Sequence, residues 1–461
     1  MSIFHSNLGK EKISEILKSR NTKIHFLGVG GVGMCSLCQL SREAGYSVSG
    51  SDREISPLCN LLIDAGYDIK IGHSEENVKG AGLVVYSIAI SEDNPEIRYA
   101  ERVGIPAISR AEYLGFIMGN YSKSISVSGS HGKSTTTAMI SEIFKSAGAD
   151  PTVVLGAALP HTDSPVRIGK KELLICEGCE YKDSFLYLSP SATVFTNLEL
   201  DHVDYFDGLD SLKRSFLEAM NLPELSVVNI DDKNLRELIP FVKTRVVTFG
   251  ESEAADYKAI IEEWKAGYYR LKIRHGDSDI LDVRLCLPCR FNAINAAAAA
   301  TAAFESGVSS DAVLTALEEF SGIERRLEKL GDYGTNLVYY DYAHHPTEIR
   351  SVINAVREIT GREVAVIFKP HTYSRTAGLF DGFVSSLSLA DKVFLSEISA
   401  IRERAIEGIS SSALASMIGE KATKINDGDV LDAIREIENY AIIIMGAANL
   451  DKVRRLIEGE K

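Results

Sequence analysis

Two glycine-rich turns, each joining an apolar strand to a helix, constrain the fold of this sequence more than any other feature. The first follows the apolar residues 23–27 and reads GVGGVG at residues 28–33. The second lies within "VSGSHGKSTTTA", residues 127–138, where an apolar strand again precedes a predicted helix. Units of strand, turn and helix build parallel sheets with helices on both faces. The sequence therefore predicts an α/β protein.

The strand and helix patterns divide the chain of 461 residues into three parts, as expected at ~150 residues per domain. We expect an N-terminal Rossmann-like domain in residues 1–122 and a central domain of P-loop ATPase type in residues 123–322. A C-terminal Rossmann-like domain is expected in residues 323–461. Residues 256–287 alternate between apolar and polar side chains, which predicts an antiparallel appendage on the mostly parallel central sheet.

Charge and apolar runs exclude several classes of protein. A formal net charge of −14 disfavours a nucleic-acid partner, because phosphate backbones attract basic surfaces. The N-terminal residues lack the apolar core of a signal peptide, and no apolar run approaches the ~20 residues of a membrane span. We therefore expect a cytoplasmic protein, monomeric or homodimeric, with no membrane and no nucleic acid as partners.

Six of the seven cysteines occur in C-x-x-C pairs, a spacing that can indicate zinc or a redox dithiol. The pairs are Cys35/Cys38, Cys176/Cys179 and Cys286/Cys289. They lie much further apart than the ~15–20 residues that separate the two pairs of a zinc ribbon. The pattern therefore favours small buried side chains over a metal site.

The first glycine turn fits the G-x-G-x-x-G fingerprint, with Asp52 about 20 residues further along the chain. Its glycines would let the backbone approach a diphosphate, and Asp52 would accept hydrogen bonds from a ribose. Both NAD and a nucleotide-diphosphate sugar offer these groups, so the motif does not distinguish between them. Glycines also occur in turns of this kind for structural reasons alone.

The second turn departs from the usual P-loop, because its Gly129 lies three positions before Gly132 instead of five. The backbone N–H groups of the turn can still cradle phosphates. Lys133 is placed to bridge the β- and γ-phosphates, and the Ser134 hydroxyl is a ligand that Mg²⁺ accepts. Capping of the helix by Ser and Thr is the competing explanation, but the Gly-Lys-Ser order after a strand favours an ATP site.

Polar side chains gather at the ends of several predicted strands, where parallel sheets bind ligands. Glu177 follows one apolar strand, and "TNLELDH", residues 196–202, ends the next with candidate metal ligands that include His202. In the third segment, "DYAHHPTEI" (341–349) and "KPHTYSRT" (369–376) again follow strands. Two such clusters in one domain favour a site over ordinary loop polarity.

Taken together, the motifs resemble those of the Mur ligases over nearly the whole chain. They include GVGGVGM, SGSD, GSHGKSTTTA, TNLELDHVDYF, FNAINAAAA, DYAHHPTEI and PHTYSRT, in the order that the family shows. The resemblance implies an ATP-dependent amide ligase with Mg²⁺, two ions by analogy, and with Mn²⁺ as a substitute. It further implies that ATP phosphorylates the lactyl carboxylate of UDP-N-acetylmuramate and that the amine of L-alanine attacks the acyl phosphate.

The resemblance also implies a role for each matching position. The implied catalytic residues are Lys133, Glu177, His202, His371 and Arg375, with Ser134, Glu177 and His202 as metal ligands. The implied ATP site consists of Gly129, Ser130, His131, Gly132, Lys133, Ser134, Thr135, Asn292, Asn295 and Arg326. The UDP-substrate region consists of Gly28, Gly30, Gly31, Gly33, Asp52 and His73. The amino-acid region consists of Tyr342, His344, His371 and Arg375, with Arg375 expected to grip the alanine carboxylate and His371 a candidate base.

Three alternatives remain open on the sequence. The nearest is a recycling ligase of the same family that attaches the L-Ala-γ-D-Glu-diaminopimelate tripeptide to UDP-N-acetylmuramate. The others are a non-catalytic nucleotide-binding regulator on the same scaffold and an NAD oxidoreductase. Retention of Lys133, Ser134, Glu177 and His202 argues against lost catalysis.

Overall fold

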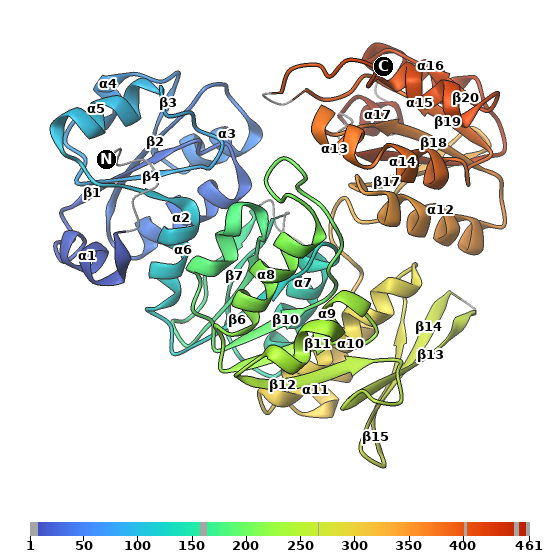
Figure 1. Cartoon of the computed structure of the whole chain (residues 1–461), viewed down its shortest axis with the longest axis horizontal. Helices are drawn as coiled ribbons and strands as arrows, with labels where there is room; N and C mark the ends of the chain where they lie inside the picture. Colours follow the sequence, from blue (N-terminus) through green and yellow to red (C-terminus); the bar gives the residue numbers. More distant parts are fainter. Residues whose placement is uncertain (1–7, 157–163, 266, 401–402, 447–450, 458–461) are drawn as a thin grey trace.

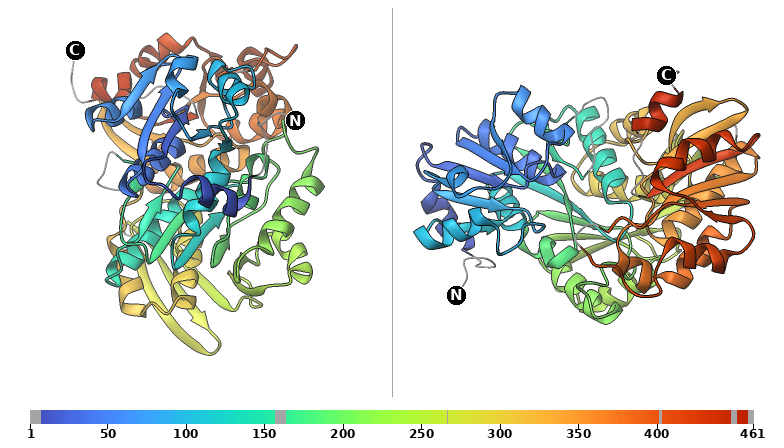
Figure 2. Two further views of the ribbon diagram at one scale, coloured as in Figure 1. Left: turned by 90° about the vertical axis from the view of Figure 1, so that its left-hand side faces the viewer. Right: turned by 90° about the horizontal axis from the view of Figure 1, so that it is seen from above.

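Three sheets, one after another along the chain, form the framework of the protein (Figure 1). The computed structural model describes residues 8–156, 164–265, 267–400, 403–446 and 451–457. The bodies built on the first and third sheets lie on either side of the central one when the molecule is viewed from above (Figure 2). No helix in these described ranges is both long and apolar enough to span a bilayer. The expected α/β architecture is confirmed.

The first sheet has the strand order β3-β2-β1-β4-β5, and all its neighbouring strands are parallel. Its strands are β1 (Lys23–Leu27), β2 (Ser47–Asp52), β3 (Asp68–Ile71), β4 (Leu83–Tyr86) and β5 (Ala107–Ser109). Its helices are α1 (Gly9–Ile16), α2 (Val32–Glu43), α3 (Pro57–Asp64), α4 (Glu75–Val78), α5 (Pro95–Val103) and α6 (Arg110–Met118). The chain order reverses between β1 and β4, and the first glycine turn leaves β1 at this ligand-binding position.

The central sheet has ten strands in the order β15-β14-β13-β12-β11-β10-β6-β9-β7-β8. Its first strands are β6 (Lys123–Ser128), β7 (Thr152–Val154), β8 (Val166–Arg167), β9 (Leu173–Gly178) and β10 (Ala192–Phe195). The others are β11 (Leu225–Asn229), β12 (Arg245–Gly250), β13 (Tyr257–Lys265), β14 (Tyr268–His275) and β15 (Ser278–Leu285). Strands β13 to β15 pair antiparallel and project from the body, which confirms the expected appendage (Figure 1).

Helices of strong formers cover the central sheet. They are α7 (Lys133–Ser146), α8 (Leu209–Met220), α9 (Lys233–Leu238), α10 (Arg290–Glu305) and α11 (Ser310–Glu319), with short 3₁₀ helices η1 (Tyr181–Tyr187) and η2 (Ile239–Phe241). The alanine run of α10 is buried almost all round, because α10 packs against both α7 and the sheet. Small side chains allow this close approach, and it places Asn292 and Asn295 of α10 near the turn before α7.

The third sheet has the order β16-β17-β21-β18-β19-β20 and is parallel except for the pair β16–β17. Its strands are β16 (Glu328–Tyr333), β17 (Asn336–Asp341), β18 (Val364–Lys369), β19 (Lys392–Leu395), β20 (Ala422–Lys424) and β21 (Ala441–Gly446). Its helices are α12 (Pro346–Thr360), α13 (Tyr373–Gly378), α14 (Phe380–Leu387), α15 (Ser411–Ile418), η3 (Asp427–Asp429), α16 (Val430–Arg435) and α17 (Asp451–Ile457). Helix α12 begins at Pro346, with a capping box between His345 and Glu348.

Gly115 of α6 marks a close contact between the first and central bodies. A Cβ on Gly115 would lie 2.1 Å from the backbone oxygen of Tyr187 in η1, whereas one on Gly119 would have its nearest neighbour at 3.4 Å. We expect Gly115→Ala to lower the free energy of unfolding by about 1–3 kcal/mol, because a backbone oxygen has to move. Gly119→Ala is the matched control and should be close to neutral. Urea unfolding of both variants tests this; equal stabilities would contradict the contact.

Candidate active site

The turn between β6 and α7 is compact because neighbouring side chains occupy the space around its glycines. Gly129 has φ +142°, and a Cβ there would lie 2.1 Å from Thr196 Oγ1. Gly132 has φ +82°, and a Cβ there would lie 2.5 Å from Asn295 Oδ1. Asn197 fixes the turn from the end of β10, accepting the His131 N–H at 2.8 Å and donating to the His131 carbonyl at 3.0 Å. The short spacing therefore comes with a turn anchored by β10 and α10.

Lys133 is paired with a carboxylate that the sequence argument did not single out. Its Nζ donates to both Glu180 oxygens at 3.0 Å and to the Ser130 carbonyl at 3.3 Å. Glu180 is 1% exposed, so this ion pair is buried. Burial disfavours the charged amine, but Glu180 and Glu177 outweigh that effect and raise the pKa of Lys133. The lysine is held cationic at the position where a phosphate would bind.

The residues expected to hold Mg²⁺ surround this lysine. Ser134 lies in the first turn of α7, and Glu177 ends β9 with its Oε1 accepting the Gly156 N–H at 2.6 Å. His202 Nε2 lies 3.7 Å from Glu180 Oε1, and the His202 backbone has φ 52°, a sparsely populated conformation for a residue with a side chain. Carboxylate and hydroxyl oxygens are the ligands that Mg²⁺ prefers, so Glu177, Glu180 and Ser134 fit this ion.

A cavity of about 150 Å³ lies between the central and third bodies. Six of the residues expected at the ATP site line it: His131, Gly132, Thr135, Asn292, Asn295 and Arg326. Phe291, Asp341 and Glu348 also contribute to its wall. Gly129, Ser130, Lys133 and Ser134 are not part of this lining and lie on the adjoining side of the turn. We call it the nucleotide cavity, because six of the ten residues expected at the ATP site line it.

His131 is the charged group that joins the central turn to the third body. Its Nδ1 lies 3.1 Å from Glu348 Oε1, and its Nε2 lies 3.3 Å from Glu199 Oε2. Burial opposes protonation of this imidazole, but the Glu348 and Glu199 carboxylates together raise the pKa of His131 to about 9. Arg326 adds a weaker contact, with Nη1 3.8 Å from Glu348 Oε1.

The sequence predicts that the Arg375 guanidinium binds the carboxylate of the amino acid. In the structure this guanidinium already has a carboxylate partner. It forms a bidentate ion pair with Asp201 of the central body, with Nε to Oδ1 at 2.8 Å and Nη2 to Oδ2 at 3.0 Å. Arg375 is 7% exposed and Asp201 5% exposed. Thr372, which caps the helix that carries Arg375, has φ 66°, a strained value for a β-branched residue. The two N–H groups that could bind a carboxylate in parallel are thus already bound to Asp201 of the central body.

His371 and His344 lie in the same region, and the Nε2 atom is a donor in His371 but an acceptor in His344. Arg375 Nη1 donates to His371 Nδ1 at 3.0 Å, and because arginine has no acceptor, the proton of His371 is on Nε2. His344 Nδ1 instead donates to the Tyr342 carbonyl at 2.9 Å, which leaves Nε2 as an acceptor. Burial lowers the pKa of each histidine to about 4, helped at His371 by the Arg375 charge. Both imidazoles are therefore neutral at pH 7.

The residues expected to hold the UDP moiety form a separate group at the ends of β1, β2 and β3. Asp52 Oδ2 accepts the Gly30 N–H at 2.8 Å, so the two ends of the first βαβ unit are tied together. His73 Nδ1 lies 3.1 Å from Glu96 Oε1, and Glu96 is fully buried. Sequence reasoning missed Glu96, because a glutamate in the first turn of α5 has the pattern of an ordinary helix start.

Arg110 is a second residue that sequence reasoning missed. Its guanidinium lies against the first glycine turn, where a Cβ on Gly33 would be 3.0 Å from Arg110 Nη1. Its charge also acts on Cys176 and Cys179 beside Glu177 of the central body. Arg110 is thus a cation between the first glycine turn and the Lys133 region. Its place after a serine N-cap gave no signal beyond helix capping.

None of the three cysteine pairs belongs to a group of possible metal ligands among the described residues. Of the paired cysteines, Cys35, Cys38, Cys176 and Cys289 are buried, as expected for small core side chains. Cys179 is half-buried and Cys286 is exposed, so the expectation of burial is wrong for Cys286 and only partly met for Cys179. The grouping of possible metal ligands among the described residues contains histidine and glutamate instead.

The Arg375–Asp201 pair generates a stability prediction. Asp201→Asn should lower the free energy of unfolding by about 3–5 kcal/mol, because it leaves a buried guanidinium unpaired. The double variant Asp201→Asn, Arg375→Gln removes that unpaired charge and should recover part of the loss. A double-mutant cycle by urea unfolding measures the coupling. If the losses of unfolding free energy in the two single variants add up to the loss in the double variant, the two residues do not interact directly.

Models of known families match all three bodies of the chain. The model described as "Mur ligase family, catalytic domain" matches residues 23–122, and "Mur ligase middle domain" matches residues 127–303. The model described as "Mur ligase, glutamate ligase domain" matches residues 325–448.

Relatives and solved structures agree with these models. The chain is 37% identical to UDP-N-acetylmuramate–L-alanine ligase of Caldicellulosiruptor saccharolyticus, covering 94% of this chain and 98% of the relative. It is 39% identical to the enzyme of the same name from Aquifex aeolicus, covering 95% and 97%. The crystal structure of UDP-N-acetylmuramate–alanine ligase from Thermotoga maritima superposes with a TM-score of 0.81 at 26% identity, covering 95% of this chain and 99% of that chain.

Proposed function

The chain belongs to the Mur ligase family, and from that premise we propose that it is an ATP-dependent ligase that joins L-alanine to the lactyl carboxylate of UDP-N-acetylmuramate. The observation that carries the proposal is the 37–39% identity over nearly the whole chain to ligases of that name. The product would be a precursor of peptidoglycan. The domain boundaries that we propose, 122/123 and 322/323, fall between α6 and β6 and between α11 and β16.

The reaction begins with transfer of the γ-phosphoryl group of ATP to the lactyl carboxylate, which gives an acyl phosphate and ADP. Both reactants are anions, so positive charge has to lie between them. Lys133 supplies one such charge, and Glu180, which now holds it, gives way to a phosphate oxygen. Glu177, Glu180, Ser134 and His202 are the residues that would hold Mg²⁺. When bound, the ion neutralises phosphate charge and orients the oxygens.

In the second step the alanine amine, after losing a proton, attacks the carbonyl carbon of the acyl phosphate, and phosphate leaves. His344 and His371 offer the hydrogen-bonding groups that the ammonium and the carboxylate of a free amino acid require. The His371 Nε2–H is a donor for the carboxylate, and His344 Nε2 is an acceptor for the ammonium. Arg375 serves mainly to orient His371, since its fork is engaged by Asp201. His371 is therefore a binding group and not the base.

Substrate dependence of phosphate release tests this function. With ATP, Mg²⁺ and UDP-N-acetylmuramate present, we expect release only when L-alanine is added. Release with the L-Ala-γ-D-Glu-diaminopimelate tripeptide alone would assign the chain to the recycling reaction. Lys133→Ala should abolish release and leave binding of the UDP substrate intact, because the residues proposed for that substrate lie in another domain. Near-normal turnover of Lys133→Ala would contradict the ATP site.

Steady-state kinetics can distinguish a role of His371 in binding L-alanine from a role in proton transfer. We expect His371→Leu to raise the KM for L-alanine by about 10- to 100-fold, the loss of one hydrogen bond to a charged group, with little change in kcat. His371→Gln keeps an N–H donor and should recover part of that loss. Steady-state kinetics from pH 6 to 9 should give profiles of the same shape in all three proteins. A large fall in kcat with loss of the acidic limb would instead make His371 the base.

A further inference from the structure

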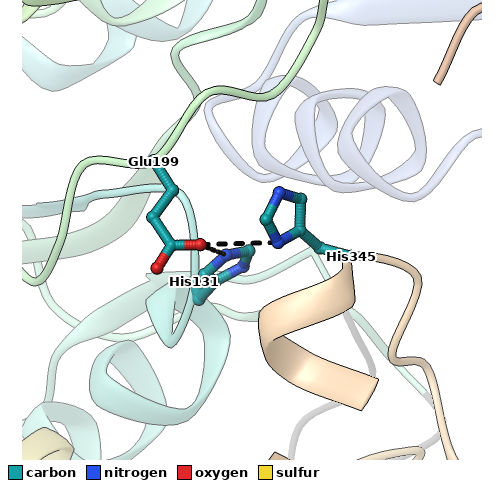
Figure 3. A group of neighbouring side chains, drawn as sticks. All are labelled: His131, Glu199 and His345. Carbon is teal, nitrogen blue, oxygen red and sulfur yellow. Dashed lines mark hydrogen bonds and ion pairs between the residues drawn. The ribbon is translucent and has the colours of Figure 1, made fainter. Parts of the chain in front are cut away.

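Two histidines and a glutamate from different parts of the chain point toward one another (Figure 3), and two of them, His131 and Glu199, line the nucleotide cavity. His131 lies in the turn between β6 and α7, Glu199 follows β10, and His345 is the N-cap of α12. One ligand atom from each of the three lies within 4.8 Å of the others. The group joins the central body to the third. His131 lies two positions before Lys133 in the same turn, but its imidazole contacts Glu199 and Glu348 and not the Lys133–Glu180 pair.

The spacing of these atoms is that of a tetrahedral metal site. Zinc binds nitrogen and carboxylate oxygen at about 2.0–2.2 Å, which places two ligands of a tetrahedron about 3.3–3.6 Å apart. His131 Nε2 lies 3.3 Å from Glu199 Oε2, and His345 Nδ1 lies 3.4 Å from the same oxygen. The two imidazole nitrogens lie within 4.8 Å of each other. A tetrahedral ion would require them to lie about 3.3–3.6 Å apart, which rotation of the side chains would have to provide.

The outer contacts of both histidines are those of metal ligands. His131 directs its other nitrogen, Nδ1, to Glu348 Oε1 at 3.1 Å, and His345 directs Nε2 to the Leu200 carbonyl at 3.4 Å. Ligating histidines regularly donate their second N–H to a carboxylate or carbonyl, which fixes the tautomer. Nδ1 of His345 accepts the Thr347 N–H at 3.3 Å, so it is unprotonated, and a metal ion would compete with that N–H for its lone pair. The protonated His131 now places its Nε2 proton between itself and Glu199 Oε2, so a metal ion bound here would replace a positive charge that the site already holds.

We propose that His131, Glu199 and His345 form a site for a divalent metal of the Zn²⁺ class, separate from the Mg²⁺ position beside Lys133. Two nitrogens and one oxygen suit Zn²⁺ or Co²⁺ and not Mg²⁺, which prefers oxygen. Three protein ligands leave a fourth position for water. The metal joins the phosphate-binding turn to α12 across the nucleotide cavity and therefore opposes nucleotide entry. This inhibitory consequence depends on the proposed function, whereas metal binding does not.

Cobalt absorption tests binding without any measurement of activity. Titration of the full-length protein with Co²⁺ should give one equivalent with the intense visible bands of four-coordinate Co²⁺. Zn²⁺ should displace it, and excess Mg²⁺ should not. Glu199→Gln and His345→Asn should each weaken binding by at least about 100-fold, since even outer contacts of ligands contribute 10- to 100-fold. Glu348→Gln, which removes such an outer contact, should weaken it by about 10- to 100-fold.

Two variants serve as matched controls. Asparagine is a good N-cap, so His345→Asn removes the imidazole while keeping the start of α12, and its thermal unfolding should match that of the unmodified protein. His202→Asn alters the proposed Mg²⁺ position and should retain the cobalt bands. Absence of the bands, their survival in Glu199→Gln and His345→Asn, or their loss in His202→Asn would overturn the proposal. Cobalt binding without Zn²⁺ inhibition against ATP would keep the metal site and contradict the nucleotide assignment of the cavity.

Discussion

The buried ion pair between Arg375 and Asp201 is the contact on which the arrangement of the candidate site depends. Both partners are less than 10% exposed, and they are 174 positions apart in the chain. Each charge would be costly to bury alone, so the loops after β10 and β18 are stable in this form only when they meet. Because Arg375 also donates to His371, the same contact determines which nitrogen of His371 faces outward. Docking of the third body and the chemistry of its histidines are therefore coupled.

Local charge explains how a protein with a net charge of −14 can receive polyanionic substrates. Lys133 is kept cationic by its ion pair with the buried Glu180, together with the nearby charge of Glu177. In the proposed reaction an incoming phosphate would replace Glu180 as the partner of Lys133, so the lysine would keep an anionic partner throughout. Arg110 extends the same principle toward the first glycine turn. Placement of a few cations, and not overall charge, determines which anions bind.

The sequence could predict features that depend on local rules. The glycine turns and the antiparallel appendage follow from short-range patterns, and the structure contains them. Glu180 and Asp201 could not be assigned in this way, because their partners Lys133 and Arg375 are distant in the chain and periodicity reports only the local element. The ion pair of Arg375 with Asp201 was missed for the same reason, and the expected role of Arg375 toward the alanine carboxylate stays a prediction.

The nucleotide cavity exists only while the central and third bodies are in contact, since Asn292 and Asn295 line it from one side and Asp341 and Glu348 from the other. A ligand that fills it gains contacts with both bodies, so its binding free energy and the free energy of domain contact are linked. Two ion-paired residues lie at this contact between the bodies. The His131 imidazole lies between two carboxylates, and the Arg375 guanidinium forms a bidentate pair with Asp201. Changes that loosen either contact should therefore weaken nucleotide and amino-acid binding together, although the two ligands touch different residues.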